Sequence, residues 1–423
     1  MAAEENPVRS QTLIKIKVGS PARGNMSKPI GWKSACGVVL LCAAATVYLP
    51  AQTYTPLFSF NRYNGSWPSA VVQGIDGNFY GTTNSGGSTK NVGTVYKITP
   101  AGKLTTLHRF SGGVEGATPR AGLVRGTDGN FYGTTNLGGP NNSGTVFKIK
   151  PGGRLTTLHS FSGADGANPW AGLIQATDGN FYGTTSAGGA HGDGTVFKIT
   201  SGGTLTTLYS FAGADGYQPT AALVQASDGN FYGTTSGGGA NGEGTVFKIT
   251  SGGTLTTLYS FCAQAGCSDG RVPAAELALG SDGDFYGTTG LGANNDSGTV
   301  FKITPGGFLT TLHSFSSFAD GGNPQAALMQ ASDGNFYGTT LFGGNTGHQG
   351  TVFKITPGGT LTTLHDGYGP TGYWPRAVLI QATDGNLYGA MASGGSNGAG
   401  VVFQLSVGLT PIAEELPTSA SSQ

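Results

Sequence analysis

Residues 178–211 read DGNFYGTTSAGGAHGDGTVFKITSGGTLTTLYSF, and this stretch decides the fold. Its three segments rich in aromatic and β-branched residues predict short strands, and the Asp-Gly and Ser-Gly-Gly pieces are typical of tight turns. An apolar run just before the stretch predicts one more strand. The four predicted strands are 171–176, 181–185, 195–200 and 205–211. Four short antiparallel strands of this kind make up one blade of a β-propeller.

The same unit recurs seven times along the chain. Its Asp-Gly-Asn-Phe tetrad returns, with small variations, every 50 to 54 residues. A fixed period of this size is the signature of a propeller or a solenoid. The tetrads begin at Asp76, Asp128, Asp178, Asp228, Asp282, Asp333 and Asp384. The sequence therefore predicts an all-β protein, a seven-bladed β-propeller with four antiparallel strands per blade.

The two ends of the repeat array indicate a closed ring. The first repeated piece, residues 54–60 (YTPLFSF), is a lone fourth strand, whereas the last, residues 377–405, supplies strands one to three. An open solenoid would instead begin and end with whole, polar capping repeats. We therefore expect the N-terminal strand to complete the last blade, so that residues 52–406 form the propeller. Residues 407–423 are expected to form a flexible C-terminal tail.

Six of the seven second strands open with an aromatic pair followed by a glycine, as in Phe181, Tyr182 and Gly183. Aromatic side chains bring large apolar areas, so we expect these pairs to fill the space between neighbouring blades. A glycine inside a strand often marks a close approach of another backbone. We therefore expect the glycine to let the neighbouring sheet come close.

The composition agrees with many short strands and argues against a nucleic-acid partner. Glycine accounts for 76 of the 423 residues, which favours turns over helices. The formal net charge is zero, and residues 52–423 hold 16 basic and 20 acidic residues without a Lys/Arg-rich run. Because a nucleic-acid-binding protein needs a basic surface, we expect no nucleic-acid partner.

Residues 1–51 read as an N-terminal extension that contains a signal peptide. Residues 35–49 form an apolar run of fifteen residues, which is short for a membrane-spanning helix and typical of a signal-peptide core. Two lysines precede the run, and Ala51 offers a small residue at a cleavage point. A start at Met26 would leave a conventional signal, residues 26–51. We expect a secreted or cell-surface protein with no membrane span after signal removal; a retained membrane anchor is the alternative.

The cysteines fit an exported protein. Cys36 and Cys42 lie within the predicted signal, so only Cys262 and Cys267 remain after its removal. An oxidising compartment favours a local disulfide between them. A metal-binding pair is the alternative, although two thiols with no nearby His make a poor zinc site.

The repeat unit resembles a known family. The pattern DGNFYGTT…GGxxGxGTVFKITPGGTLTTLHSF is similar, over residues 54–406, to the GloVer tandem repeat of exported bacterial proteins, often described as choice-of-anchor proteins. The strand order also resembles that of NHL and related propellers. The resemblance implies export, a surface or extracellular location and a repeat scaffold. It brings no catalytic residue to this chain.

Any binding site is expected on one face of the ring. The 1–2 and 3–4 turns are short and nearly identical between units, and uniform turns serve folding. The 4–1 loops on the opposite face vary in length and carry aromatic residues, and variable loops on a rigid scaffold commonly bind ligands. The predicted ligand-binding residues are Trp67, Trp170, Tyr217, Tyr373 and Trp374. They suit an extracellular glycan or a protein or peptide ligand; packing of the blade tops is the alternative.

Other residue patterns give no catalytic, metal or cofactor site. One fourth-strand position alternates between His and Tyr, as at His159 and Tyr209, which indicates packing. The Asp-Gly loops at Asp165, Asp215 and Asp320 could bind calcium but lack the spacing of a calcium loop. The GGxxGxG loops lead into strands and not helices, which excludes a phosphate cradle and leaves no cofactor predicted.

The sequence favours a monomeric, non-catalytic binding or structural module. One alternative is an extracellular carbohydrate-active hydrolase or lyase, because propellers host many activities. That enzyme would need two carboxylates to meet at the channel. The acidic residues available for such a pair are Glu115, Glu243, Asp269 and Glu276. A purely structural envelope component is the other alternative.

Overall fold

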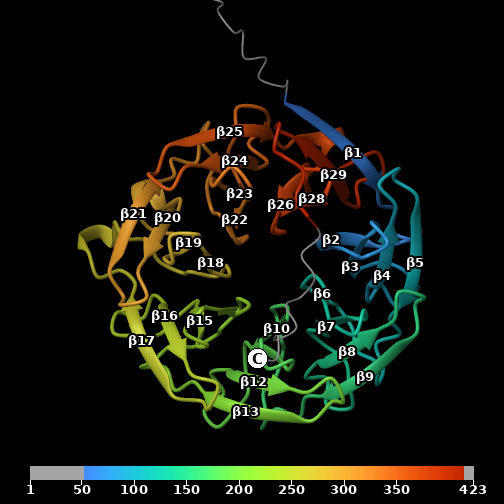
Figure 1. Cartoon of the computed structure of the whole chain (residues 1–423), viewed down its shortest axis with the longest axis horizontal. Coiled ribbons are helices and arrows are strands. Elements are labelled where there is room, and N and C mark those ends of the chain that lie inside the picture. The colour runs from blue at the N-terminus through green and yellow to red at the C-terminus, as the bar shows by residue number, and fades with distance from the viewer. Residues whose placement is uncertain (1–51, 414–423) are drawn as a thin grey trace, which may run out of the picture. The chain divides into compact units, whose positions relative to one another are not determined.

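A computed structural model describes residues 52–413 as seven antiparallel sheets arranged in a ring (Figure 1), and residues from all seven repeats border a central channel. The predicted seven-bladed, all-β propeller is therefore confirmed. The predicted signal peptide within residues 1–51 lies outside the described residues, as do residues 414–423 of the predicted tail. Residues 52–413 contain no helix with the length and apolar character needed to cross a membrane.

The blades follow one another along the chain, and each begins with its innermost strand. Blades 1 to 3 consist of β2 (Ser66–Gln73), β3 (Phe79–Ser85), β4 (Thr94–Ile98), β5 (Leu104–Arg109), β6 (Val124–Arg125), β7 (Phe131–Thr135), β8 (Thr145–Ile149), β9 (Leu155–Ser160), β10 (Ile174–Gln175), β11 (Phe181–Thr185), β12 (Thr195–Ile199) and β13 (Leu205–Ser210). Blades 4 to 6 consist of β14 (Val224–Gln225), β15 (Phe231–Thr235), β16 (Thr245–Ile249), β17 (Leu255–Ser260), β18 (Ala278–Leu279), β19 (Phe285–Thr289), β20 (Thr299–Ile303), β21 (Leu309–Ser314), β22 (Met329–Gln330), β23 (Phe336–Thr340), β24 (Thr351–Ile355) and β25 (Leu361–Asp366).

Blade 7 is assembled from both ends of the repeat array. It contains β26 (Tyr373–Pro375), β27 (Ile380–Gln381), β28 (Leu387–Ser393), β29 (Val401–Ser406) and β1 (Thr53–Ser59). Within the described part of the chain, the helices are the short η1 (Ala265–Cys267), η2 (Asn294–Asp296) and η3 (Gly369–Thr371).

The aromatic pair of each second strand holds neighbouring blades together. In blade 3 the ring of Phe181 stacks on Tyr132 of blade 2 at 3.9 Å, and Tyr182 stacks on Phe231 of blade 4 at 4.1 Å. Six of the seven junctions carry such a Tyr–Phe stack, with ring centroids 3.9–4.2 Å apart. At the junction of blades 6 and 7, Leu387 takes the place of the phenylalanine. The same pair of residues therefore builds the core between blades all around the ring.

The glycine after this pair serves its own blade, and the expectation that it admits the neighbouring sheet is wrong. Gly183 lies opposite Phe197 in the pairing of β11 with β12. A Cβ at Gly183 would lie 2.7 Å from the Phe197 ring and 2.8 Å from Leu173, both in blade 3. The missing side chain leaves room for the phenylalanine ring to lie across the strand.

The Asp-Gly turns provide hydrogen-bond acceptors for the hydroxyl groups of the buried tyrosines. The Tyr182 hydroxyl donates to the Asp178 carboxylate at 2.8 Å, and the same carboxylate accepts from the backbone and side chain of Asn180. Burial and this bond raise the pKa of the Tyr182 hydroxyl. The turn amide of Thr177 donates to Gln225 of the next blade at 2.9 Å. The turn residues thus support both the strand and the neighbouring blade.

The N-terminal strand closes the ring, as the split repeat predicts. Strand β1 pairs with β29 antiparallel from Thr53↔Ser406 to Ser59↔Val401, and the two lie side by side in Figure 1. The interface between blades 7 and 1 repeats the other junctions. Tyr388 stacks on Phe79 at 4.1 Å, and the Thr383 amide donates to Gln73 at 3.0 Å.

The first residues of the predicted flexible tail contact the ring. Val407 and Leu409 pack against the core between blades 6 and 7. The carbonyl oxygen of Thr410 accepts a hydrogen bond from Gln381 at 3.0 Å.

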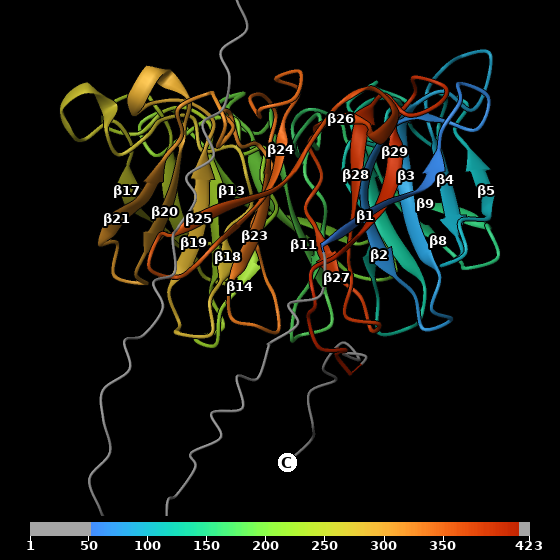
Figure 2. The ribbon, with the colours of Figure 1, turned by 90° about the horizontal axis from the view of Figure 1, so that it is seen from above.

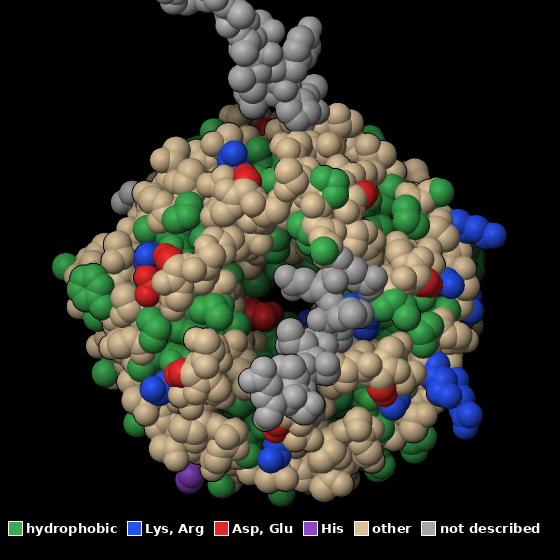
Figure 3. Space-filling view, viewed as in Figure 1, with side chains coloured by type: hydrophobic (Ala, Val, Ile, Leu, Met, Phe, Trp, Pro, Cys, Tyr) green, Lys and Arg blue, Asp and Glu red, His purple; other side chains and the backbone are tan. Residues whose placement is uncertain are grey.

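The two faces of the ring differ. Figure 2 shows longer loops along one edge and short turns along the other. We call these the loop face, with the 4–1 and 2–3 loops, and the turn face, with the 1–2 and 3–4 turns. Figure 3 looks onto the turn face, where acidic and basic side chains lie close together, as in the ion pairs Lys148–Asp128 and Lys302–Asp282.

Candidate ligand site at the mouth of the channel

A repeated backbone geometry on the loop face positions the mouth of the channel. In every blade a proline follows a residue in the left-handed region, with φ between 52° and 59°. These left-handed residues are Trp67, Thr118, Asn168, Gln218, Val272, Asn323 and Trp374. Large and β-branched side chains rarely adopt this conformation. Its recurrence in all seven blades indicates that it belongs to the scaffold.

The hydrogen bonds of these residues explain the conformation. In blade 3 the Asn168 amide donates to the Ser143 carbonyl of blade 2 at 2.8 Å, while its own carbonyl accepts from Ser186 of blade 3. All seven junctions have the equivalent amide bond, at 2.8–3.0 Å. The proline ring then packs against a glycine of the preceding blade, since a Cβ at Gly144 would lie 2.7 Å from Cδ of Pro169. In each blade the chain therefore turns into the channel at the same point of the repeat.

The residue after the proline lines the channel in every blade. Together with its neighbours it borders a cavity of about 570 Å³. The seven residues at this position are Ser69, Arg120, Trp170, Thr220, Ala274, Gln325 and Arg376. The next residue is alanine in all seven blades. The side chains that differ between blades therefore project from equivalent points of the scaffold.

Two arginines lie at this mouth without acidic partners. The Arg120 guanidinium stacks 3.8 Å above the Trp170 ring. Burial lowers the pKa of Arg120, and the nearby Arg376 lowers it further; burial also lowers the pKa of Arg376. Neither side chain forms an ion pair with a carboxylate of residues 52–413. The mouth therefore carries a concentration of positive charge.

Several buried polar atoms of the cavity lack a partner. Arg120 Nε, Asn84 Oδ1 and Thr220 Oγ1 are all buried, and none has a hydrogen-bond partner in the described part of the chain. All three residues line the same cavity. Unpaired buried polar atoms cost about 1–3 kcal/mol each, so folded proteins rarely keep them without a role.

Glu276 is the one carboxylate that lines the cavity within the described residues. Burial raises its pKa to about 7. It forms no ion pair with the side chains of residues 52–413. The wall from blade 5 therefore carries a negative charge that depends on pH near neutrality.

The other three carboxylates considered for an enzyme are held at the loops. Glu115 lies 3.2 Å from His108, and Glu243 pairs with Arg271 at 3.5 Å. Asp269 accepts from Tyr259 at 2.8 Å and from the Ala263 amide at 2.9 Å. Only Glu276 of the four lines the cavity, so these residues do not supply the facing pair that glycoside hydrolysis requires.

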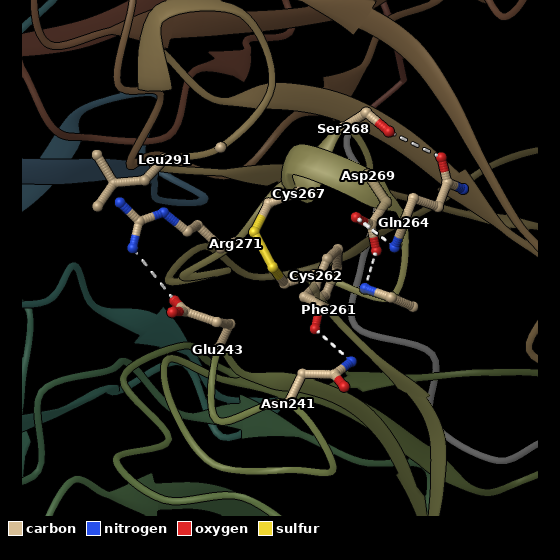
Figure 4. The surroundings of a disulfide bond; sticks show 12 residues. Asn241, Glu243, Phe261, Cys262, Gln264, Cys267, Ser268, Asp269, Arg271 and Leu291 are labelled. Atoms are coloured by element: carbon tan, nitrogen blue, oxygen red, sulfur yellow. Dashed lines mark hydrogen bonds and ion pairs between the residues drawn. A yellow bond between two sulfur atoms is a disulfide. The ribbon is translucent and has the colours of Figure 1, made fainter.

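Figure 4 shows how the longest 4–1 loop is held. The sulfur atoms of Cys262 and Cys267 are bonded to each other, and Arg271 points from this loop toward Glu243 of the preceding blade. Asp269 belongs to the same loop, is fully buried and accepts from the Gln264 amide at 3.3 Å.

The Asp-Gly loops use their carboxylates to anchor themselves to the fourth strand. Asp165 contacts His159 at 2.7 Å and accepts from the Ser162 amide at 2.8 Å. Asp215 accepts from the Tyr209 hydroxyl in the same way. The alternation of His and Tyr at this position thus preserves one structural contact. Among residues 52–413, no group of three or more His, Cys, Asp or Glu side chains is placed to hold a metal ion.

The predicted aromatic residues divide into two groups. Trp67 and Trp170 line the cavity and are 42% and 40% exposed. Tyr217 covers Gly237 of its own blade, where an added Cβ would lie 2.2 Å from the ring. Tyr373 and Trp374 contact each other edge-on at 5.0 Å and do not line the cavity. Arg120 and Arg376 were not among the predicted binding residues, although each directly follows the repeated proline; Glu276, three residues after Pro273, was predicted only as a carboxylate of the alternative enzyme.

Comparison with known proteins identifies the repeat. The family model described as the Gloeobacter/Verrucomicrobia repeat matches residues 43–176, 149–331, 214–366 and 280–416. No curated protein matches the chain.

Solved structures with a similar fold include the extracellular domain of a hybrid two-component system from B. thetaiotaomicron. It is 13% identical with a TM-score of 0.55, over 86% of this chain and 44% of that one, so this chain spans less than half its length. The periplasmic gluconolactonase of Pseudomonas aeruginosa is 19% identical with a TM-score of 0.47, over 70% of this chain and 84% of that one. These likenesses concern the fold alone.

Proposed function

Since the chain belongs to the Gloeobacter/Verrucomicrobia repeat family, we propose that it is an exported, non-catalytic binding protein whose ligand occupies the mouth of the channel on the loop face. The observation that carries the proposal is the single variable position between a repeated proline and a repeated alanine. It presents six residue types from seven equivalent points of one scaffold.

Several features of the mouth support binding. A cavity of about 570 Å³ falls within the range of small-molecule and oligosaccharide sites. The two tryptophans that line it, Trp67 and Trp170, are partly exposed, although aromatic side chains of this size are usually well covered. Arg120, Asn84 and Thr220 line the cavity, and each has a buried polar atom without a hydrogen-bond partner in residues 52–413.

A glycan or a peptide suits these groups best. The flat faces of tryptophan side chains can stack against sugar rings, and amide, hydroxyl and guanidinium groups can bond to hydroxyls. Catalysis is not favoured, because Glu276 is the one carboxylate lining the cavity in the described part of the chain.

The test is a screen of glycan and peptide arrays with the unmodified chain and with the double variant Trp67→Ala/Trp170→Ala. Phe308→Ala is the matched control, since this aromatic residue is 74% exposed and lies in a 3–4 turn on the opposite face. Binding that is lost in the double variant and kept in the control supports the proposal. A complete absence of ligands would favour a purely structural component, and binding that survives the double change would place the site elsewhere.

A further inference from the structure

We infer that the ligand of this mouth is an acidic sugar chain, with a carboxylate held between Arg120 and Arg376 and sugar rings lying against Trp67 and Trp170. This inference rests on the proposed function and specifies its ligand class.

The arrangement of the arginines is the first reason. Arg376 comes from blade 7 and Arg120 from blade 2, on either side of blade 1. Blade 1 has the small Ser69 at the equivalent position, and its segment into the strand is one residue shorter than in the other blades. All three residues line the cavity. The two guanidinium groups therefore flank a position with little side-chain bulk between them.

The electrostatic cost of this arrangement is the second reason. Two like charges that are partly withdrawn from water, with no carboxylate of residues 52–413 paired to them, destabilise the free protein. An anion between them would relieve this repulsion. Guanidinium groups bind carboxylates through paired, charge-assisted hydrogen bonds, and Arg120 Nε is a buried donor without a partner.

The stacking of Arg120 on Trp170 does not by itself account for these residues. A cation–π contact satisfies the face of the guanidinium but leaves its N–H groups free to bond in the plane. Arg376 forms no such stack on an aromatic ring of the described residues. Packing therefore explains the position of Arg120 and not the presence of a second arginine beside it.

The tryptophans favour a sugar chain over an acidic peptide. Trp67 comes from blade 1 and Trp170 from blade 3, so they lie on both sides of the blade that provides Arg120. Arg120 stacks on the Trp170 ring and Trp67 lines the same cavity from the other side, which matches a carboxylate attached to a sugar ring. A long nucleic acid fits less well, because residues 52–423 have more acidic than basic residues and Glu276 lines the same cavity.

Isothermal titration of the full chain provides the test. The probes are a defined oligogalacturonate, a neutral oligosaccharide of the same length and a poly-glutamate peptide. We expect the oligogalacturonate to bind, with affinity falling as salt rises. The double variant Arg120→Gln/Arg376→Gln should raise the Kd at least about tenfold, because charge-assisted bonds are lost. Arg154→Gln, at an exposed 3–4 turn on the opposite face, should leave the Kd unchanged.

The outcomes separate this inference from the proposed function. Loss of binding in the arginine variant, with a melting temperature no lower than that of the unmodified chain, supports both. If the neutral sugar or the peptide binds at the tryptophans and the oligogalacturonate does not, the inference is wrong and the proposed function stands. The inference is equally wrong, and the proposed function again stands, if the oligogalacturonate binds normally to the arginine variant but fails to bind Trp67→Ala/Trp170→Ala. If the tryptophan variant binds every probe as the unmodified chain does, both are overturned. If no probe binds at all, the inference is overturned and the array screen decides the proposed function.

Discussion

Replacing Glu276 by glutamine should remove a pH-dependent loss of stability from the ring. In the folded protein the carboxyl group lies in the channel wall, and burial raises its pKa from 4.5 to about 7. The other charged residues that line the cavity, Arg120 and Arg376, form no ion pair with it. Burial therefore opposes the ionisation of Glu276 in the folded state, and no ion pair offsets this cost.

The sign and size of the effect follow from the difference between the pKa of Glu276 in the folded state and in the unfolded state. Below pH 4.5 the group is protonated in both the folded and the unfolded state, so the variant and the unmodified chain should be equally stable. Between pH 4.5 and about 7 the unfolded state loses the proton first, and the free energy of unfolding falls as pH rises. The full difference corresponds to about 3.4 kcal/mol. Because Glu276 remains partly exposed to the water of the channel, we expect about 2 kcal/mol.

The assay is urea unfolding of both proteins at several pH values from 4.5 to 8.5. The difference in unfolding free energy between Glu276→Gln and the unmodified chain should be near zero at the acidic end and reach about 2 kcal/mol in favour of the variant above pH 8. Glu243→Gln is the control, since that carboxylate lies at the loops beside Arg271 and does not line the cavity. Parallel profiles for Glu276→Gln and the unmodified chain would refute the burial of this group.

Three further changes test the scaffold and the export signal. Tyr54→Ala should lower the free energy of unfolding by about 3 kcal/mol in a urea titration, because Tyr54 stacks on Phe403 at 4.9 Å and on His365 of blade 6 at 3.8 Å. Thr55→Ala, at an exposed position of the same strand, is the control. Equal losses in the two variants would contradict the closure of the ring by β1. Gly183→Ala should cost about 1–3 kcal/mol, since the new Cβ would lie 2.7 Å from Phe197, whereas Gly152→Ala meets no atom within 4 Å and should be near neutral in the same assay. N-terminal sequencing of the exported protein should begin at Gln52, and a chain that retains residues 35–49 would indicate a membrane anchor instead.

The repeated sequence predicts the scaffold well because the residues that make its structural contacts recur from repeat to repeat. The predicted strands 181–185 and 195–200 agree with β11 and β12 to within one residue, and the lone segment 54–60 closes the ring as β1. The first strand is the exception. Residues 171–176 predict a six-residue strand, but β10 contains only Ile174 and Gln175. The left-handed residue before Pro169 turns the chain into the channel. Residues 170–173, which come before β10, therefore line the cavity without pairing with β11.

The residues that line the cavity were harder to predict, because most of them share a position relative to the repeated proline and not a residue type. Aromatic character predicts the same role for all of the predicted 4–1 loop residues, yet Trp170 lines the cavity while Tyr217 covers Gly237. The φ angle before the proline is the same in all seven blades, and the two side chains differ in position: Trp170 directly follows Pro169, whereas Tyr217 lies two residues before Pro219. Arg120 and Arg376 carry no motif, and only the shared geometry of seven blades brings them to one mouth.

A ring built from equivalent blades can distinguish one ligand from another only where the equivalence is broken. Contacts that recur in every blade, such as the amide bond of the left-handed residue and the proline on the preceding glycine, cannot orient an asymmetric ligand. The position after the proline breaks the equivalence with side chains alone, while the backbone stays fixed. At this position Arg376 lies in blade 7 and Arg120 in blade 2, whereas the carboxylate of Glu276 lines the channel from blade 5. The charge therefore differs across the channel. An anionic ligand should therefore bind toward the side of blades 7, 1 and 2, and moving the arginine from blade 2 to blade 4, as in Arg120→Thr/Thr220→Arg, should weaken its binding although the net charge of the mouth is unchanged.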